Sequence, residues 1–321
     1  MKGICGLGNL GNSCYMNATL QILSQMDEFN DYLVERKELI KLPDSIITFE
    51  WIQLYQLIQQ NHCSVIPHRF VERLRQVSLQ KKRPEFASFQ HNDSVEFFAF
   101  LLDCIHNSLN GLDTSVKHKN ELPSLHAYLE GIEQKDSSIV QQLFMSCSMY
   151  HYVHPVTHQI EFSKIEHETI VSLSIPDSDS AVTLEDCFVE TFKEEVLTGE
   201  NAWFDEKEQI KKTVVKKSAL CHTPPLLILH LKRWRKNLSK KQVRIHAPLS
   251  IDLQKFTLSP SPCPYELFGI INHEGTIQHG HYYSYVKKKD WYSINDQFIQ
   301  SITPEQLIHE NNYCLFYRKI K

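Results

Sequence analysis

The 321-residue sequence predicts an α+β protein in which a helical N-terminal part is followed by a β-rich C-terminal part. Up to about residue 145, apolar residues recur at helical spacing, as in Met16, Leu20 and Leu23. From about residue 150 onward, short runs of β-branched and aromatic residues take over. We expect the two parts to face each other across a cleft.

Individual elements follow from the same patterns. Further helices are predicted around Phe97, Leu101 and Ile105, and over residues 49–58 and 70–77. The β-rich runs are Ile170–Ile175, Leu226–Leu231, Leu267–Asn272, Tyr282–Val286, Trp291–Ile294 and Tyr313–Tyr317, which we expect to form an antiparallel sheet. The polar stretches Asp177–Ala181 and Arg235–Gln242 are predicted to be loops.

Composition and charge narrow the classes of partner and compartment. The formal net charge of −4 argues against a nucleic-acid partner, because phosphate-binding domains usually carry a strongly basic face. The sequence has no apolar stretch long enough for a membrane helix and no secretion signal. Nine scattered cysteines favour reduced thiols over a disulfide framework. We therefore expect an intracellular monomer, cytoplasmic or nuclear, without a membrane partner.

A glycine-bearing loop near the N-terminus runs into the first amphipathic helix and places Cys14 at the helix start. The unpaired N–H groups and the dipole at a helix N-terminus favour a thiolate, which is the nucleophilic form of cysteine. These N–H groups, together with the amide of Asn9, can hold the oxyanion of a tetrahedral intermediate. The alternative is that Cys14 is a small buried residue and that Gly8 and Gly11 only shape a turn.

The segment Gly6–Gln21 resembles the cysteine box of the ubiquitin-specific proteases, with Ser13 and Ala18 as mild departures. Downstream, Asn272–Gly275 and Gly280–Val286 are similar to the histidine box of that family, and Trp291–Asp296 is similar to the element that supplies the third catalytic residue. The resemblance implies that Cys14 is the nucleophile and His281 the base. It also implies that Asn295 orients the imidazole and that Asp296 is a neighbouring polar group able to share this task.

The segment Gln90–Phe97 resembles the family's Q-Q-D-A-x-E-F box, with His91 and Asn92 in place of the two glutamines. The resemblance implies that Asp93 and Glu96 bind the arginines of the Arg-Leu-Arg-Gly-Gly tail of ubiquitin. It leaves substrate-backbone contacts to His91, to Gln90 or to neither, and it places His273 and Tyr282 along the passage around the two glycines. The alternative is that Asn92 caps a helix whose first turn the two acids stabilise.

The resemblance covers about residues 3 to 319 and implies a single papain-like catalytic domain, 1–321. A helical thumb would occupy residues 1–145, and a β-sheet palm with β-ribbon fingers would occupy 146–321, leaving no room for an appended domain. Many family members hold the fingertips with zinc bound by two Cys-x-x-Cys pairs, but Asp205 and Glu208 replace the second pair here. We therefore expect no metal and no cofactor. We expect packing by Tyr150, Tyr152, Trp203 and Phe204 instead, and give little weight to a metal site built from Cys147, His151, His154 and His158.

The predicted function is that of a deubiquitinating cysteine protease, which hydrolyses the bond after the C-terminal glycine of ubiquitin through a thioester. Ubiquitin or a ubiquitinated protein is then the expected partner. Three alternatives share some of these features. They are an inactive ubiquitin-binding module, a protease for another ubiquitin-like modifier, and a general papain-like peptidase with an open cleft.

Overall fold

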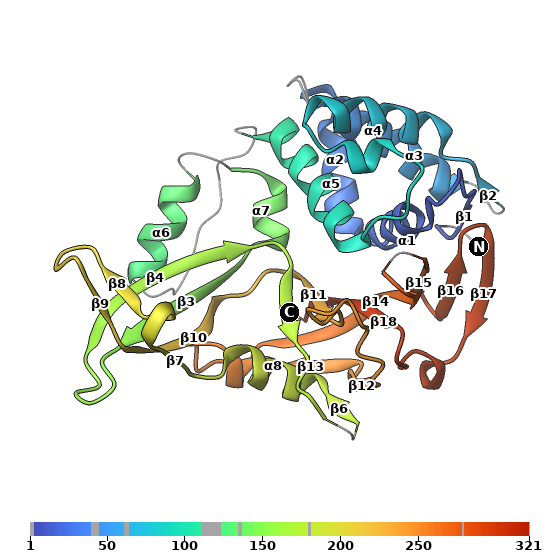
Figure 1. Ribbon diagram of the computed structural model, residues 1–321. Coiled ribbons are helices and arrows are strands. Elements are labelled where there is room, and N and C mark those ends of the chain that lie inside the picture. The colour runs from blue at the N-terminus through green and yellow to red at the C-terminus, as the bar shows by residue number, and fades with distance from the viewer. Residues whose placement is uncertain are drawn as a thin grey trace.

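A computed structural model describes residues 3–39, 45–60, 64–110, 123–133, 137–178, 181–277 and 279–320. Helices gather at one end of the molecule, and a large sheet lies beneath them and continues into an extended ribbon (Figure 1). We call these parts the thumb, the palm and the fingers. The α+β class predicted from the sequence is confirmed, and the switch to strands comes at Ser146, where β3 begins.

The thumb contains α1 (Cys14–Leu23), α2 (Asp27–Arg36), α3 (Ser45–Gln60), α4 (His68–Gln80), α5 (Ser94–Leu109) and α7 (Ile139–Phe144). The four helices predicted from apolar spacing correspond to α1, α3, α4 and α5. A short parallel pair, β1 (Gly6–Leu7) with β2 (Ser64–Val65), holds the N-terminal segment beside them. α6 (Pro123–Glu133) lies apart from this group, over the fingers (Figure 1).

The palm is a sheet of eight strands with the order β17-β16-β15-β14-β18-β11-β5 and with β13 paired to β14. Its strands are β5 (Val171–Ser174), β11 (Leu226–Lys232), β13 (Ser250–Asp252), β14 (Pro264–Gly275), β15 (Gly280–Lys287), β16 (Trp291–Asn295), β17 (Phe298–Ile302) and β18 (Asn312–Lys319). All six predicted β-runs lie in this sheet. The expectation of a wholly antiparallel sheet is wrong at one edge, because β5 pairs in parallel with β11. A parallel pair needs a long crossover, and the fingers together with α8 (Leu184–Phe192) supply it.

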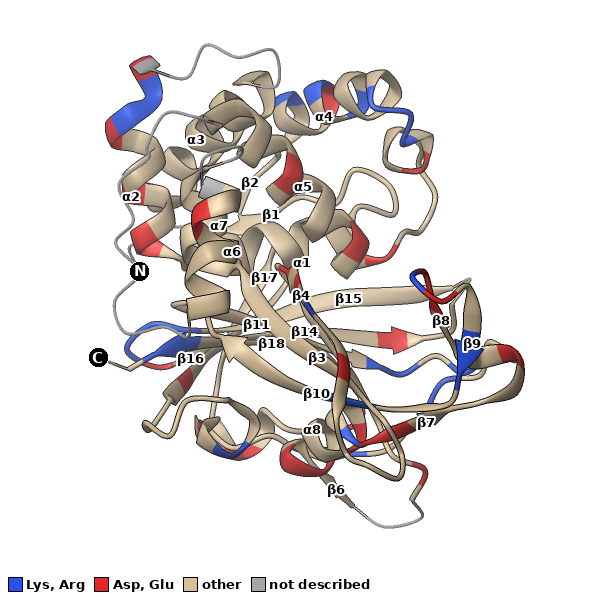
Figure 2. Ribbon diagram, turned by 90° about the vertical axis from the view of Figure 1, so that its left-hand side faces the viewer, with Lys and Arg blue, Asp and Glu red and all other residues tan. Residues whose placement is uncertain are grey.

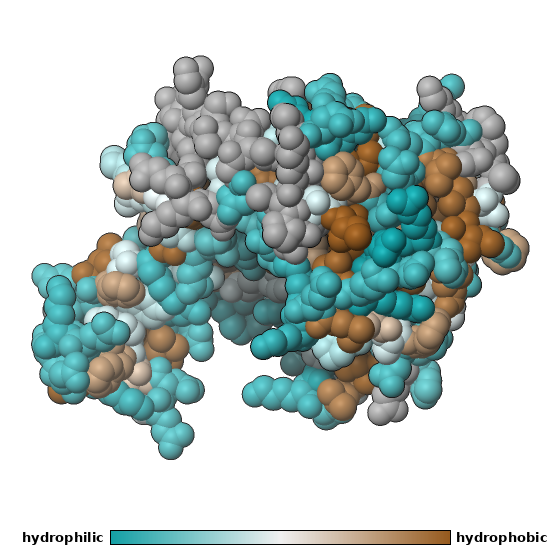
Figure 3. Space-filling model, turned by 90° about the horizontal axis from the view of Figure 1, so that it is seen from above, coloured by the Kyte–Doolittle hydropathy of each residue, from teal (hydrophilic) through white to brown (hydrophobic). Residues whose placement is uncertain are grey.

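The fingers are a second sheet, with the order β4-β3-β10-β7, that extends away from the palm. Its strands are β3 (Ser146–Val153), β4 (Ile160–Glu168), β7 (Glu195–Leu197) and β10 (Val214–His222), and a small hairpin of β8 (Trp203–Asp205) and β9 (Ile210–Lys212) lies at its tip. One further parallel pair joins β6 (Val182–Thr183) to β12 (Ile245–His246). Seen from above, the molecule is hollowed between the fingers and its main body (Figure 3).

The thumb packs directly on the palm, and this contact positions the functional site. A methyl group at Gly269 of β14 would lie 2.8 Å from Cδ1 of Ile22, so the absence of a side chain lets α1 approach the sheet closely. The rings of Phe98 in α5 and Phe316 in β18 lie 5.6 Å apart in the same core. The N-terminus of α1 is thereby fixed against β15. Among the described helices, none combines the length and apolar character needed to cross a bilayer.

Candidate active site

The loop of residues 8–13 brings the chain sharply into α1 and presents Cys14 as the first helical residue. Gly11 and Asn12 both have positive φ, at 89° and 52°, a conformation that glycine and asparagine adopt more readily than other residues. Within the loop, the backbone N–H of Leu10 donates to Ser13 Oγ at 2.8 Å, and that of Gly11 donates to Asn9 Oδ1 at 3.0 Å. Cys14 itself is 1% exposed, so its sulfur is accessible only along a narrow approach.

His281, near the start of β15, lies beside Cys14, which is the strongest influence on the pKa of its imidazole. On its other side, Nε2 of His281 lies 2.7 Å from Oδ1 of Asn295, the last residue of β16. An amide oxygen can only accept, so Nε2 carries the proton and Nδ1 is the nitrogen left for the thiol. The fold thus places Cys14, His281 and Asn295 in one chain of contacts.

The electrostatics of this trio favour a proton on the imidazole. Hydrogen bonding of the ring to the Cys14 sulfur raises the pKa of His281 to about 9, with the Asn295 contact and the charge of Asp296 adding to the effect and partial burial opposing it. A protonated His281 beside the sulfur favours the thiolate, which is the form in which cysteine acts as a nucleophile.

Asp296 does not contact His281 through a hydrogen bond but ties the palm to the catalytic loop. Its carboxylate accepts from Asn17 Nδ2 at 2.7 Å and from Asn9 Nδ2 at 2.9 Å, while its carbonyl accepts from the backbone of Leu7 at 2.9 Å. These bonds orient the Asn9 amide at the N-terminus of α1. Because an amide group carries two hydrogens, one remains available to an oxyanion near Cys14.

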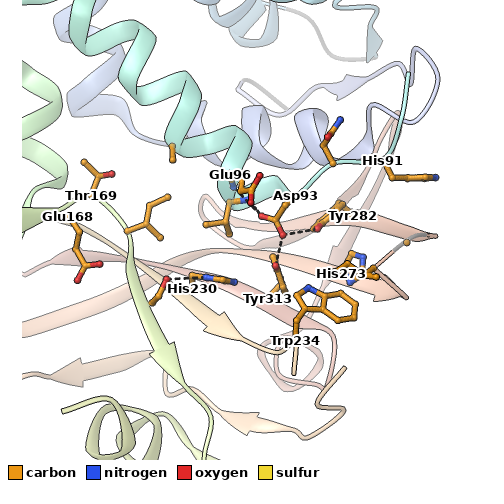
Figure 4. Close-up of a pocket in the computed structure, with 17 residues that line it drawn as sticks. His91, Asp93, Glu96, Glu168, Thr169, His230, Trp234, His273, Tyr282 and Tyr313 are labelled. Carbon is orange, nitrogen blue, oxygen red and sulfur yellow. Dashed lines mark hydrogen bonds between the residues drawn. The ribbon is translucent and has the colours of Figure 1, made fainter. Parts of the chain in front are cut away.

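A groove of about 780 Å³ runs between thumb and palm and reaches the catalytic centre at Gly280, the neighbour of His281. All five substrate-binding residues predicted from the sequence line it: His91, Asp93, Glu96, His273 and Tyr282. Figure 4 shows Asp93 in the middle of the groove, with Glu168 on one side and His91 and His273 on the other. The groove therefore has acids along its length and aromatic rings at its catalytic end.

Asp93 is held by the fold at every acceptor position. Oδ1 caps α5 by accepting from the backbone of Val95 at 2.7 Å and of Glu96 at 3.1 Å, so the helix cap is Asp93 rather than Asn92. Oδ2 accepts from the hydroxyls of Tyr282 and Tyr313 (Figure 4). Two carboxylate oxygens offer about four lone-pair sites, and all are in use. By contrast, the Glu96 side chain is 67% exposed, and its one ionic contact among the described residues is with Arg83, at 4.0 Å.

The catalytic end of the groove is narrow because Gly280 packs against the His273 imidazole. A methyl group at Gly280 would overlap Nε2 of His273. Burial, reinforced by the positive charge of Lys240, lowers the pKa of His273 to about 4, so its ring is neutral. The ring of Tyr282 lies 4.5 Å from that of His273. This passage admits an extended chain with very small side chains.

Several residues of the site were not predicted from the sequence. Asn17 lies inside the recognised cysteine box and Tyr313 inside a predicted β-run, but neither pattern distinguished them from core residues. Glu168, at the end of β4, gave no signal in its local pattern. Desolvation in the groove raises the pKa of Glu168 to about 7. The positive charge of Lys232 opposes this rise, and the negative charge of nearby Glu166 adds to it. The Glu168 side chain has no hydrogen bond or ion pair among the described residues.

Comparison with known proteins decides the family. A family model described as ubiquitin carboxyl-terminal hydrolase matches residues 5–317. The chain belongs to the ubiquitin carboxyl-terminal hydrolase family. It is 30% identical to ubiquitin carboxyl-terminal hydrolase 2 of Bos taurus over 348 residues, covering 98% of this chain and 55% of that protein. It is 25% identical to ubiquitin carboxyl-terminal hydrolase 21 of Mus musculus, covering 99% of this chain and 62% of that protein. The chain thus spans little more than half the length of these curated relatives.

Solved structures of the same fold support the assignment of architecture. The SAGA Ubp8/Sgf11/Sus1/Sgf73 DUB module bound to ubiquitin aldehyde contains a chain that matches with a TM-score of 0.78 at 21% identity, covering all of this chain and 70% of that chain. Another structure of the Ubp8-Sgf11-Sgf73-Sus1 module matches with a TM-score of 0.77 at 22% identity. The papain-like thumb, palm and fingers predicted from the family resemblance are confirmed.

At the fingertip, this ubiquitin carboxyl-terminal hydrolase domain has an ion-pair cluster at Asp205 and Glu208, the two acids that were noted in place of a Cys-x-x-Cys pair. Lys212 Nζ lies 2.7 Å from Asp205 and 2.8 Å from Glu208, and Asp205 Oδ1 accepts from the backbone of Lys207 at 2.9 Å. Figure 2 shows acidic and basic residues side by side around β8 and β9. The Lys212 hydrogen bond lowers the pKa of Asp205, as expected for a paired carboxylate.

Aromatic packing behind this cluster was predicted in part. The rings of Tyr152 and Trp203 lie 6.2 Å apart, and Phe162 stacks on Trp203 at 5.9 Å. Phe162 was not predicted, and Phe204 is 46% exposed rather than packed. Two of the three histidines weighed as metal ligands have other partners. His151 contacts Ser163, and His154 accepts from the backbone of the following turn. Across the described residues, no group of three or more potential ligands converges on one point.

Proposed function

We propose that this chain is a deubiquitinating cysteine protease, cutting the bond that follows the C-terminal glycine of ubiquitin. The observation that supports it most strongly is the Cys14–His281–Asn295 arrangement at the closed end of an acidic groove. The family to which the chain belongs is named for hydrolysis at the carboxyl terminus of ubiquitin. One structure with the same fold was solved with ubiquitin aldehyde bound.

In this proposal, the tail of ubiquitin lies extended in the groove with its two glycines in the passage formed by His273, Gly280 and Tyr282. Only residues without side chains fit there. Glu96 has free acceptor sites for a tail arginine, whereas the acceptor sites of Asp93 are occupied by the backbone of α5 and by two tyrosine hydroxyls. His91 lies at the thumb side of the passage, within reach of the substrate backbone.

In the proposed reaction, Cys14 acts as a thiolate beside a protonated His281. The Cys14 thiolate attacks the carbonyl carbon of the terminal glycine, and the negative charge that develops on oxygen is stabilised by the Cys14 backbone N–H and the Asn9 amide. The C–N bond breaks as His281 gives its proton to the departing amine, leaving a thioester on Cys14. A water molecule then gives a proton to His281 and attacks the thioester, which releases the free carboxylate and restores the pair.

Ubiquitin with an electrophile in place of its C-terminal carboxylate tests this proposal. We expect a covalent adduct whose mass equals the sum of the two proteins, located on Cys14 by peptide mapping and absent from Cys14→Ala. An adduct that persists in Cys14→Ala, or no adduct with the intact chain, would support the inactive binding module instead. Parallel probes built on other ubiquitin-like modifiers test the choice of modifier, and faster labelling by one of them would replace ubiquitin in the proposal.

A further inference from the structure

Three large apolar side chains stand exposed around the catalytic loop. Ile66 is 67% exposed, Phe89 is 59% exposed and Phe298 is 70% exposed, although each adjoins a segment of the active site. Exposed aromatic and branched side chains grouped at one place usually mark a contact surface. In Figure 3, apolar side chains gather at the end of the molecule that carries β2 and β17 in Figure 1.

Ile66 and Phe89 flank the loop that leads to Cys14. A methyl group at Gly8 would lie 3.2 Å from Cγ1 of Ile66, and one at Gly11 would lie 3.3 Å from Cδ1 of Phe89. Phe89 is also fixed in position, because its carbonyl accepts from Asn12 Nδ2 at 2.8 Å and the guanidinium of Arg75 stacks 3.8 Å above its ring. Both side chains are therefore held against the loop while most of their surface faces solvent.

Phe298 lies on the palm side of the same region. It is the first residue of β17 and pairs directly with Asn295, so the two side chains project from the same face of the hairpin. The backbone of the preceding residue, Gln297, packs against Gly6, two residues before the glycine that touches Ile66. The exposed ring thus stands beside the catalytic amide, next to the strand that carries the loop.

None of these three residues lines the groove that runs from Glu168 to Gly280. The groove holds the part of the substrate before the scissile bond, so the part after that bond must leave on the far side of Cys14. We propose that Ile66, Phe89 and Phe298 form a docking surface for the lysine-bearing polypeptide, an inference that rests on the proposed function. The surface would contact apolar residues of that polypeptide next to its modified lysine. Continuity with the catalytic centre identifies the occupant, since this polypeptide is the part of the substrate that the groove does not hold.

The surface is tested with three substrates that share ubiquitin and differ after the scissile bond. One carries a lysine peptide with leucines on both sides of the lysine, a second carries the same peptide with serines, and a third carries only an aminocoumarin. We expect the intact chain to cleave the leucine conjugate about fivefold more efficiently than the serine conjugate, through a lower KM. Phe298→Ser and Ile66→Ser should each remove most of this preference and leave aminocoumarin release unchanged.

Val189→Ser is the matched control, because Val189 is 55% exposed on α8, on the opposite side of the palm. It should change none of the three rates. Equal cleavage of the leucine and serine conjugates by the intact chain would overturn the docking surface. An equal loss on all three substrates in Phe298→Ser would also overturn it, since Phe298 would then act through Asn295. Failure of the intact chain to release aminocoumarin would instead overturn the proposed function.

Discussion

The catalytic centre and the fingertip of this domain are stabilised by contacts of very different range. At the catalytic centre, Asp296 bonds to Asn9 and Asn17 across 287 and 279 residues of chain. At the fingertip, Asp205, Glu208 and Lys212 lie within one hairpin. The chemistry therefore depends on closure of the whole fold, whereas the fingertip can be altered locally. Substitutions at the catalytic centre should therefore change kcat, and substitutions at the fingertip should change KM.

The largest effect is expected for Asp296→Ala, which removes the acceptor that orients Asn9. Losing one oxyanion donor costs on the order of 100-fold in kcat, and Asn9 without its anchor approaches that loss. KM should change little, because Asn9 acts on a charge that develops only in the transition state. Steady-state hydrolysis of a ubiquitin–aminocoumarin conjugate measures both constants.

Asp290→Ala is the control for Asp296→Ala. Asp290 is an exposed acid just before β16, and Asp296 directly follows the same strand. It should retain the kcat of the unmodified chain. If Asp296→Ala also retained it, the bond to Asn9 would have no part in catalysis.

A smaller effect should distinguish Asp93 from Glu96 in the groove. Glu96→Gln should raise KM about tenfold without lowering the free energy of unfolding, because it removes only a charge that faces the substrate. Asp93→Ala should lower the free energy of unfolding by about 2 kcal/mol, because it removes the cap of α5. Urea denaturation and steady-state kinetics on both variants provide the comparison. A rise in KM for Asp93→Ala with unchanged stability would show that Asp93 contacts the substrate after all.

The smallest effect is expected at the fingertip. Lys212→Met removes the cation that joins the largely buried Asp205 and the exposed Glu208, and ion pairs within one surface hairpin contribute little to stability. We expect KM for a ubiquitin conjugate to rise about two- to threefold, with kcat unchanged. Lys236→Met, an exposed lysine in the loop 235–242, is the control and should change neither constant. A lower kcat in Lys212→Met would show that the fingertip is coupled to the catalytic centre.

The sequence predicted the helices and strands whose apolar spacing is regular, and motifs located Cys14, His281 and Asn295. Local patterns did not predict α8 or the individual strands of the fingers, because β4, for example, is largely exposed and has no regular alternation or apolar run. The helix cap was misplaced by one residue, since Asn92 and Asp93 are both good caps and only the backbone conformation distinguishes them. The anchoring role of Asp296 depends on contacts between distant segments, which local patterns do not encode.

The pH dependence of Cys14 alkylation tests most directly the claim that the fold pairs this thiol with His281. Iodoacetamide reacts with thiolates, and labelling of the Cys14 peptide can be followed by mass spectrometry in the intact chain and in His281→Ala. Because the pKa of His281 is raised to about 9, the ion pair should persist from neutral pH up to that value, and the rate should stay nearly flat between about pH 7 and 8.5. In His281→Ala the rate should rise about tenfold per pH unit below the ordinary cysteine value of ~8.5. The same steep rise in both proteins would contradict the pairing.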